Sequence, residues 1–200
     1  MMKLLHSPTS PYARKVRVVA IEKGLADRIE IVNAIPWPDP SVVAAANPLG
    51  RVPTLILEDG TPLYDSPVIC EYLDSRVPAS PLIPYDGPGR WLTLRRQALA
   101  DGILDDAVAL VLEGRRPVGE QSPSAQQRAT LAIRRSVAAL AAEVRPADGP
   151  FDLGQIATSV ALGYLEFRLG HLDLGTSARP LAEFWNVVKA RPSLASTKPG

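Results

Sequence analysis

The sequence predicts an α/β unit with a mixed sheet, followed by an all-helical unit. Three observations support this fold class. Strand-like and helix-like patterns alternate through residues 1–77, residues 78–89 are rich in proline and glycine, and the rest of the chain carries only helical periodicities. We therefore expect one domain at 1–77, a linker at 78–89 and a helical domain at 90–200.

The composition is that of an ordinary globular protein large enough to be an enzyme. Of its 200 residues, 46% are hydrophobic and 22% are charged, with a net charge of +1. We expect no nucleic-acid or membrane partner, because the net charge is small and no run approaches the roughly 18–20 apolar residues of a membrane span. The start lacks a secretory signal pattern, which predicts a cytoplasmic protein. A single cysteine excludes an internal disulfide, and two histidines are too few for a convincing metal cluster.

The first domain reads as strand, helix, strand, short helix, strand, strand, helix, with boundaries at 3–6, 11–23, 29–32, 41–46, 54–57, 62–64 and a last helix from Ser66. Asp59-Gly60 marks the tip of the hairpin between the last two strands. Ser66 is predicted to cap the last helix, whose inner face would hold Ile69, Tyr72 and Leu73. This order is the thioredoxin-like arrangement of a mixed four-stranded sheet.

The second domain is predicted to hold helices at 92–113, 124–145, 153–169 and 180–191. Asp152 and Gln155 have the spacing of a capping box for the third of them. We expect the short segment after Arg191 to be loose. Short basic pairs such as Arg14-Lys15 are interpreted as solvated helix surface without a partner.

Ser10-Pro11-Tyr12 stands where the first strand gives way to the first helix. The simple interpretation is a helix cap, since serine is a favoured N-cap and proline fits the first helical position. The functional interpretation adds that the Ser10 hydroxyl and the first free amides donate to a thiolate held nearby, which lowers the thiol pKa from about 8.5. Serine itself is not predicted to attack, because no histidine lies within a plausible triad.

Two further motifs can hold a small peptide that carries such a thiol. The backbone of Val52, in Arg51-Val52-Pro53, can pair with an extended peptide, and a cis bond before Pro53 would be a feature of a tight turn. Alternatively, Val52-Pro53 has a trans bond and only begins a strand. In Asp65-Ser66-Pro67, free helix amides and the Ser66 hydroxyl suit a carboxylate, and the Asp65 carboxylate suits an ammonium group. The alternative is a simple helix cap.

Together, Ser10-Pro11-Tyr12, the stretch from Asn47 to Pro53, and Asp65-Ser66 resemble the glutathione-transferase superfamily in order and spacing over nearly the whole chain. The sequence is most similar to small bacterial members that carry serine where related groups carry cysteine. The resemblance implies a glutathione site in which Ser10 stabilises the thiolate and Pro11 and Tyr12 also contact the substrate. Val52 would bond the cysteinyl backbone, with Pro53 as a further substrate-binding residue beside it. Asp65 and Ser66 would hold the γ-glutamyl end, and Arg51 would reach the glycine carboxylate. Trp37 either borders that end or packs on the sheet.

The resemblance also implies the reaction class. Glutathione would be a cosubstrate, no other cofactor or metal would be needed, and the chain would form a homodimer that works in detoxification. Serine in place of cysteine favours conjugation, isomerisation or dehalogenation over thiol reduction. A binding or regulatory protein that keeps the fold without turnover is the alternative.

The second substrate would be an apolar electrophile bound between Ser10, Tyr12 and the helix around 98–106. Asp101 and Asp105 lie one helical turn apart and either face that cleft or are solvated. Cys70 is interpreted as a small core residue without chemistry.

Overall fold

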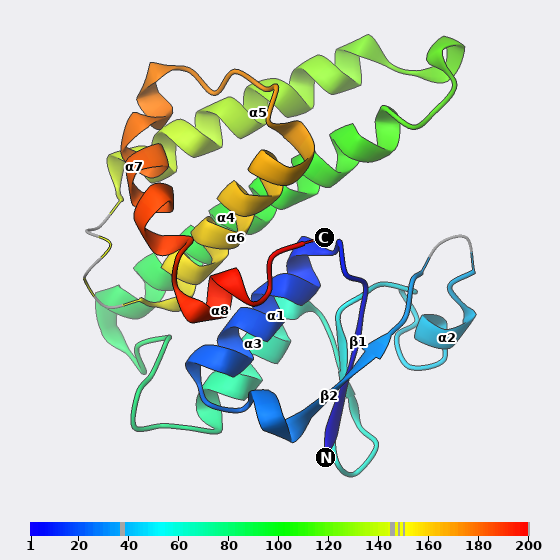
Figure 1. The fold of residues 1–200 in the computed structure, drawn as a ribbon, viewed down its shortest axis with the longest axis vertical. Helices are drawn as coiled ribbons and strands as arrows, with labels where there is room; N and C mark the ends of the chain where they lie inside the picture. Colours follow the sequence, from blue (N-terminus) through cyan, green and yellow to red (C-terminus); the bar gives the residue numbers. More distant parts are fainter. Residues whose placement is uncertain (37–38, 145–146, 148, 150, 200) are drawn as a thin grey trace. The chain divides into compact units, whose positions relative to one another are not determined.

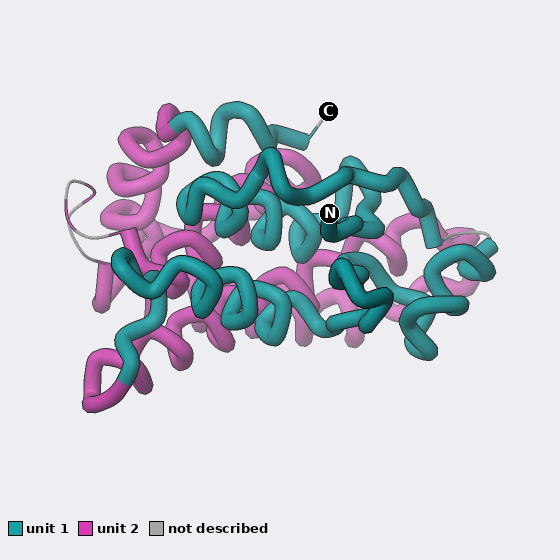
Figure 2. Tube along the Cα trace, turned by 90° about the horizontal axis from the view of Figure 1, so that it is seen from below, with its two compact units in different colours: residues 1–85, 192–200 teal, residues 86–191 magenta. Residues whose placement is uncertain are grey.

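The computed structural model describes residues 1–36, 39–144, 147, 149 and 151–199. The chain divides into unit 1, residues 1–85 with 192–200, and unit 2, residues 86–191, coloured separately in Figure 2. Unit 1 has the thioredoxin-like arrangement that the sequence predicts, and unit 2 is helical. No helix in the described part of the chain is long and apolar enough to cross a bilayer.

Unit 1 is built on a four-stranded mixed sheet in the order β2-β1-β3-β4. Its strands are β1 (Met2–His6), β2 (Ile29–Asn33), β3 (Thr54–Ile56) and β4 (Pro62–Leu63). β1 pairs parallel with β2 and antiparallel with β3, and β4 pairs antiparallel with β3. The parallel pair requires a crossover, which α1 (Pro11–Glu22) and a short 3-10 turn (Ala26–Arg28) supply.

Alternating side chains of the sheet bury two separate apolar layers. Leu4 and its antiparallel partner Leu55 share one face, and both are almost fully buried. Leu5 points to the other face, where it packs with Val43 of α2 (Ser41–Ala44) and with the side chain of Val52. Helices α1 and α3 (Ser66–Ser75) pack against each other beside the sheet (Figure 1). Both faces are therefore covered, as the central strands of a mixed sheet require.

The segment at 192–199 is ordered, which corrects the expectation that the end of the chain is loose. It forms α8 (Pro192–Ala195), which packs against α1 within unit 1 (Figure 1). Leu194 is 1% exposed, so burial of an apolar side chain fixes the segment. The interpretation of Arg14-Lys15 as solvated surface is also wrong, because Arg14 is 7% and Lys15 0% exposed.

Unit 2 consists of long helices around one central helix. Its elements are α4 (Gly87–Glu113), α5 (Pro123–Ala142), α6 (Leu153–Leu169) and α7 (Arg179–Val188), with 3-10 turns at Val118–Glu120 and Thr176–Ala178. Helix α4 begins inside the predicted linker. Most residues of α6 are buried, because it packs against α4 along much of its length.

The predicted capping box of α6 is confirmed. The Gln155 amide donates to Asp152 Oδ1 over 2.9 Å, and the Asp152 amide donates back to Gln155 Oε1 over 3.3 Å. Gly154 follows the cap because α4 approaches closely here: a Cβ atom would lie 2.9 Å from Arg96 Cβ and 3.1 Å from the Thr93 carbonyl oxygen. The box and this glycine together fix where α6 starts against α4.

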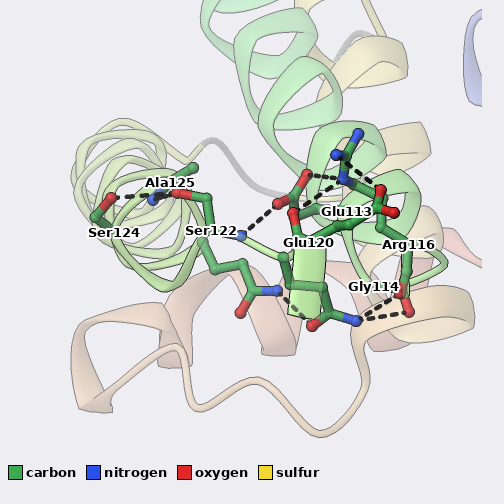
Figure 3. A network of polar contacts seen from close by, with 9 residues as sticks. Glu113, Gly114, Arg116, Glu120, Ser122, Ser124 and Ala125 are labelled. Carbon is green, nitrogen blue, oxygen red and sulfur yellow. Dashed lines mark hydrogen bonds and ion pairs between the residues drawn. The ribbon is translucent and has the colours of Figure 1, made fainter. Parts of the chain in front are cut away.

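A polar network closes the connection between α4 and α5 (Figure 3). Glu113, the last residue of α4, accepts a hydrogen bond of 2.6 Å from the Ser122 amide, and Ser122 is the N-cap of α5. Arg116 lies 3.3 Å from Glu120 across the intervening turn, and Gln121 donates to the Arg116 carbonyl over 3.0 Å. The ends of both helices thus obtain partners from the turn itself, as exposed helix ends need.

Candidate functional site

Ser10 caps α1 and keeps its hydroxyl hydrogen available. It has an extended backbone, and its Oγ accepts a hydrogen bond of 3.2 Å from the Ala13 amide. Pro11 follows at the first helical position and is buried, and Tyr12 is half-buried. Since the Ser10 oxygen acts as the acceptor within the cap, its own O–H can donate to an acceptor outside the chain. The cap interpretation is confirmed, and it is compatible with the thiolate interpretation.

His6 ends β1 shortly before Ser10, and its side chain is occupied within the sheet. It is 5% exposed and hydrogen bonds to the side chain of Asn33, its register partner on β2. Burial is the main cause that lowers the pKa of His6, and the positive charge of Arg17 lowers it further. His6 is thus a buried sheet residue.

The loop before β3 presents the backbone of Val52. Its side chain packs inward against the cluster of Leu5, Ala34 and Val43, and the peptide bond to Pro53 is cis. Among the described residues, no partner is found for the amide or the carbonyl of Val52. These two groups have the hydrogen-bonding capacity that an extended peptide would use.

Asn47 holds this loop, although sequence reasoning names it only as the start of the stretch that ends at Pro53. Its buried amide nitrogen donates to the Arg51 carbonyl over 2.9 Å and to Thr54 Oγ1 over 3.2 Å. Its oxygen accepts from the Leu49 amide over 3.0 Å. Gly50 completes the turn at a φ of +60°, a conformation that side chains disfavour. The sequence signal for this role is an asparagine that begins a turn ending in glycine, because asparagine side chains bond the backbone of turns.

The start of α3 differs from the prediction in one respect. The N-cap is Asp65, whose carboxylate accepts a hydrogen bond from the Ser66 amide, and Ser66 is the first helical residue rather than the cap. That amide is therefore occupied. Ser66 is 1% exposed, and its hydroxyl oxygen has no hydrogen-bond partner among the described residues. A buried hydroxyl without a partner is costly, so this oxygen marks a place where a polar ligand would find a ready donor.

The topology brings Ser10, Val52 and Asp65 to one end of the sheet. Ser10 follows the carboxyl end of β1, and the antiparallel β3 begins at that same end, with Thr54 opposite Leu5. β4 runs back along β3 and ends with Leu63 opposite Leu55, so Asp65 also lies toward the start of β3. Three motifs far apart in the sequence thus converge at this end of the sheet in unit 1.

The remaining candidates are Arg51 in the same loop as Val52, Cys70 in the core of unit 1, two aspartates of unit 2, and Trp37. Arg51 is exposed beside Val52, and Cys70 is a fully buried core residue of α3. Asp101 is partly buried and Asp105 is exposed on α4, in unit 2. Burial and the charge of Asp105 raise the pKa of their neighbour Asp106. Trp37 lies outside the described residues.

Unit 1 also contains a cavity of about 270 Å³ at the opposite end of the sheet. Met2, at the start of β1, lines it together with Leu25, Leu57 and Arg76. Because β1 runs from Met2 toward Ser10, this cavity is separate from the converging motifs.

Comparison with known proteins identifies the family. The family described as "Glutathione S-transferase, N-terminal domain" matches residues 9–76, which include Ser10, Val52, Asp65 and Ser66. The uncharacterized GST-like protein YibF of Escherichia coli is 36% identical over 99% of this chain and 98% of its own length. The chain belongs to the glutathione S-transferase superfamily. The stringent starvation protein A homologue of Pasteurella multocida is 40% identical over 48% of this chain and 45% of its own length.

Solved structures of this superfamily share the entire fold. A glutathione S-transferase from Methylobacillus flagellatus, with glutathione bound, is 44% identical with a TM-score of 0.92 over 100% of both chains. A glutathione transferase family member from Pseudomonas fluorescens, also with bound glutathione, is 36% identical with a TM-score of 0.94 over 100% of both chains.

Proposed function

We propose that this protein is a glutathione transferase that activates the thiol of glutathione for attack on a hydrophobic electrophile. The observation that carries the proposal is the free donor capacity of Ser10 at the N-terminal end of α1. Relatives that match the whole chain and contain bound glutathione support the choice of thiol. Glutathione would serve as cosubstrate, without a metal or nucleotide.

Ser10 and the helix end would act on the thiol together. A hydrogen bond to a charged group contributes about 1.5–3 kcal/mol, which corresponds to a decrease of roughly one to two units in the thiol pKa. Starting from about 8.5, such a decrease makes the thiolate a major species at neutral pH. The positive end of the α1 dipole adds to this effect. The thiolate then attacks the electrophilic carbon, and the carbon–sulfur bond forms as the leaving group departs or the double bond accepts the electron pair.

The other groups at this end of the sheet would bind the peptide part of glutathione. The Val52 amide and carbonyl would pair with the cysteinyl backbone, and the Ser66 hydroxyl would donate to the γ-glutamyl carboxylate. Asp65 uses one oxygen as the helix cap, which leaves the other for the ammonium group. Arg51, exposed beside Val52, would reach the glycine carboxylate.

A second candidate is a glutathione-binding or regulatory protein without turnover. It is supported by relatives whose names refer to starvation and not to a transferase: homologues of stringent starvation protein A match about half of this chain. Glutathione-dependent isomerisation or dehalogenation would use the same residues with another substrate. Homodimer formation, a cytoplasmic location and a role in detoxification are parts of the first proposal that the sequence resemblance suggests.

The deciding experiment follows the thiolate by its ultraviolet absorbance and turnover with a panel of electrophiles. In Ser10→Ala we expect glutathione still to bind, while the thiolate fraction and the rate at neutral pH fall about tenfold or more. Ser7→Ala removes a nearby hydroxyl from the same loop and should leave both unchanged. An equal thiolate fraction in wild type and Ser10→Ala would contradict the role of Ser10. Retention on glutathione resin without turnover of any electrophile would favour the binding protein.

A further inference from the structure

Arg14 is a buried cation on the helix that carries Ser10. It lies one turn further along α1, and its amide donates to the Ser10 carbonyl over 3.0 Å. Its side chain is 7% exposed and turns to the last residues of the chain. Nη2 donates to the Leu194 carbonyl over 3.1 Å, and Nε lies 3.5 Å from Thr197 Oγ1. One guanidinium thus connects the first turn of α1 with two positions of the C-terminal segment.

The C-terminal segment is itself well fixed. Thr197, 2% exposed, donates through its hydroxyl to the Ser193 carbonyl over 2.7 Å, which closes the turn that Arg14 contacts. Ser193 Oγ donates to Glu22 Oε1 over 2.5 Å. Since Glu22 is the last residue of α1, residues 192–197 contact this helix near both of its ends.

A purely apolar contact would hold the two segments together at lower cost than a buried arginine. Removing a guanidinium from water is unfavourable unless its hydrogen bonds are made. A planar guanidinium, however, fixes the directions of its hydrogen bonds, because its donors have a rigid geometry. The segment therefore restrains the position of the first turn of α1 along and around the helix axis, as well as its packing.

We propose that residues 192–197 position the N-terminal end of α1 through Arg14, and thereby set how well Ser10 stabilises the glutathione thiolate. Arg14 is a positioning residue in this scheme, and the inference depends on the proposed function. The hydrogen bond from Ser10 to sulfur depends on direction, so a small shift of the helix end weakens it. Asp65 and Ser66 lie on α3, so peptide binding is separable from thiolate formation.

The test uses full-length variants and two measurements. The pH titration of thiolate absorbance reports ionisation, and calorimetry with S-methylglutathione, which has no thiol, reports peptide binding. In Arg14→Met we expect the thiolate fraction at neutral pH to fall at least about threefold, with the Kd for S-methylglutathione within about twofold of wild type. Thr197→Val removes one acceptor and should cause a smaller change in the same direction.

Arg14→Lys separates position from charge, because lysine keeps the charge but cannot reach both acceptors with fixed geometry. We expect a loss of thiolate close to that of Arg14→Met. A wild-type thiolate fraction in Arg14→Lys would show that charge alone matters and would overturn the proposal.

A matched control distinguishes positioning from a general loss of stability. Asp152→Ala removes the N-cap of α6 and changes no residue of α1 or of the C-terminal segment. It should destabilise the protein without changing the thiolate titration; an equal loss of thiolate would assign Arg14 a merely structural role. If the wild-type protein binds S-methylglutathione but forms no thiolate from glutathione, the proposed function itself fails, which is a separate outcome.

Discussion

Lys23 Nζ lies 2.7 Å from Asp74 Oδ1 in a buried ion pair that joins the end of α1 to the end of α3. Both side chains are almost inaccessible. Lys23 also donates to the carbonyls of Val77 and Ser80, and Asp74 accepts from the amides of Leu82 and Ile83. The pair therefore organises the chain as it leaves α3, because backbone groups satisfy the remaining donors and acceptors of both charges.

Replacing Lys23 by methionine should destabilise the protein strongly. Asp74 would remain buried without its counter-ion, a loss of about 3–5 kcal/mol in the free energy of unfolding. Urea unfolding measures this quantity. Lys3→Met is the matched control, because the Lys3–Glu30 pair is exposed and 3.4 Å long, and its loss should cost less than about 1 kcal/mol. Equal costs for the two variants would contradict the structural role of the buried pair.

Ser66→Ala should separate ligand binding from stability. The hydroxyl is buried without a partner, so its removal should leave the free energy of unfolding unchanged or raise it slightly. Glutathione should bind about tenfold more weakly, since a hydrogen bond to a charged carboxylate is lost. Calorimetry and urea unfolding give the two values. The control is Ser75→Ala, at the far end of α3, where the exposed hydroxyl donates to the Tyr72 carbonyl. Unchanged glutathione affinity in Ser66→Ala would remove Ser66 from the site.

Asp65→Asn should weaken glutathione binding while keeping α3 capped. Asparagine is as good an N-cap as aspartate, so the free energy of unfolding should change by less than about 0.5 kcal/mol. The ammonium group of the ligand, however, loses its counter-charge. Asp65→Ala is the comparison, because it should lose about 1 kcal/mol of stability as well as affinity. If Asp65→Asn binds glutathione as wild type does, Asp65 acts only as a cap.

His6 should make stability depend on pH. Burial lowers the pKa of His6 in the folded protein below its usual value of 6.5, so between these two values the unfolded chain binds a proton that the folded protein does not. The free energy of unfolding should consequently decrease as pH falls from about 6.5 to the folded pKa. Urea unfolding across this range should show a smaller slope in His6→Gln. His171→Gln, at an exposed position, should keep the wild-type slope; a slope that His6→Gln leaves unchanged would contradict the prediction.

The order of the elements and the site motifs follow from local patterns. Alternating and helical periodicities, Ser-Pro at two helix starts and the capping box at Asp152 involve residues close together in sequence, where propensity and hydrogen bonding act. The predicted start of α3 is wrong by one residue, because local propensity alone does not choose between two good caps. Serine and aspartate are both good caps, and the backbone conformation that selects Asp65 is visible only in the structure.

The sequence by itself determined the thioredoxin-like arrangement, the helical second unit and the three motifs of the candidate site. Only the tertiary structure decided that Arg14 and Lys15 are buried, that the Ser66 hydroxyl has no partner, and that residues 192–197 return to α1. The physical reason is sequence distance. Periodicity reports which face of an element is apolar, but Arg14 and Leu194 meet through a specific hydrogen bond between distant segments, and no local pattern specifies that partner.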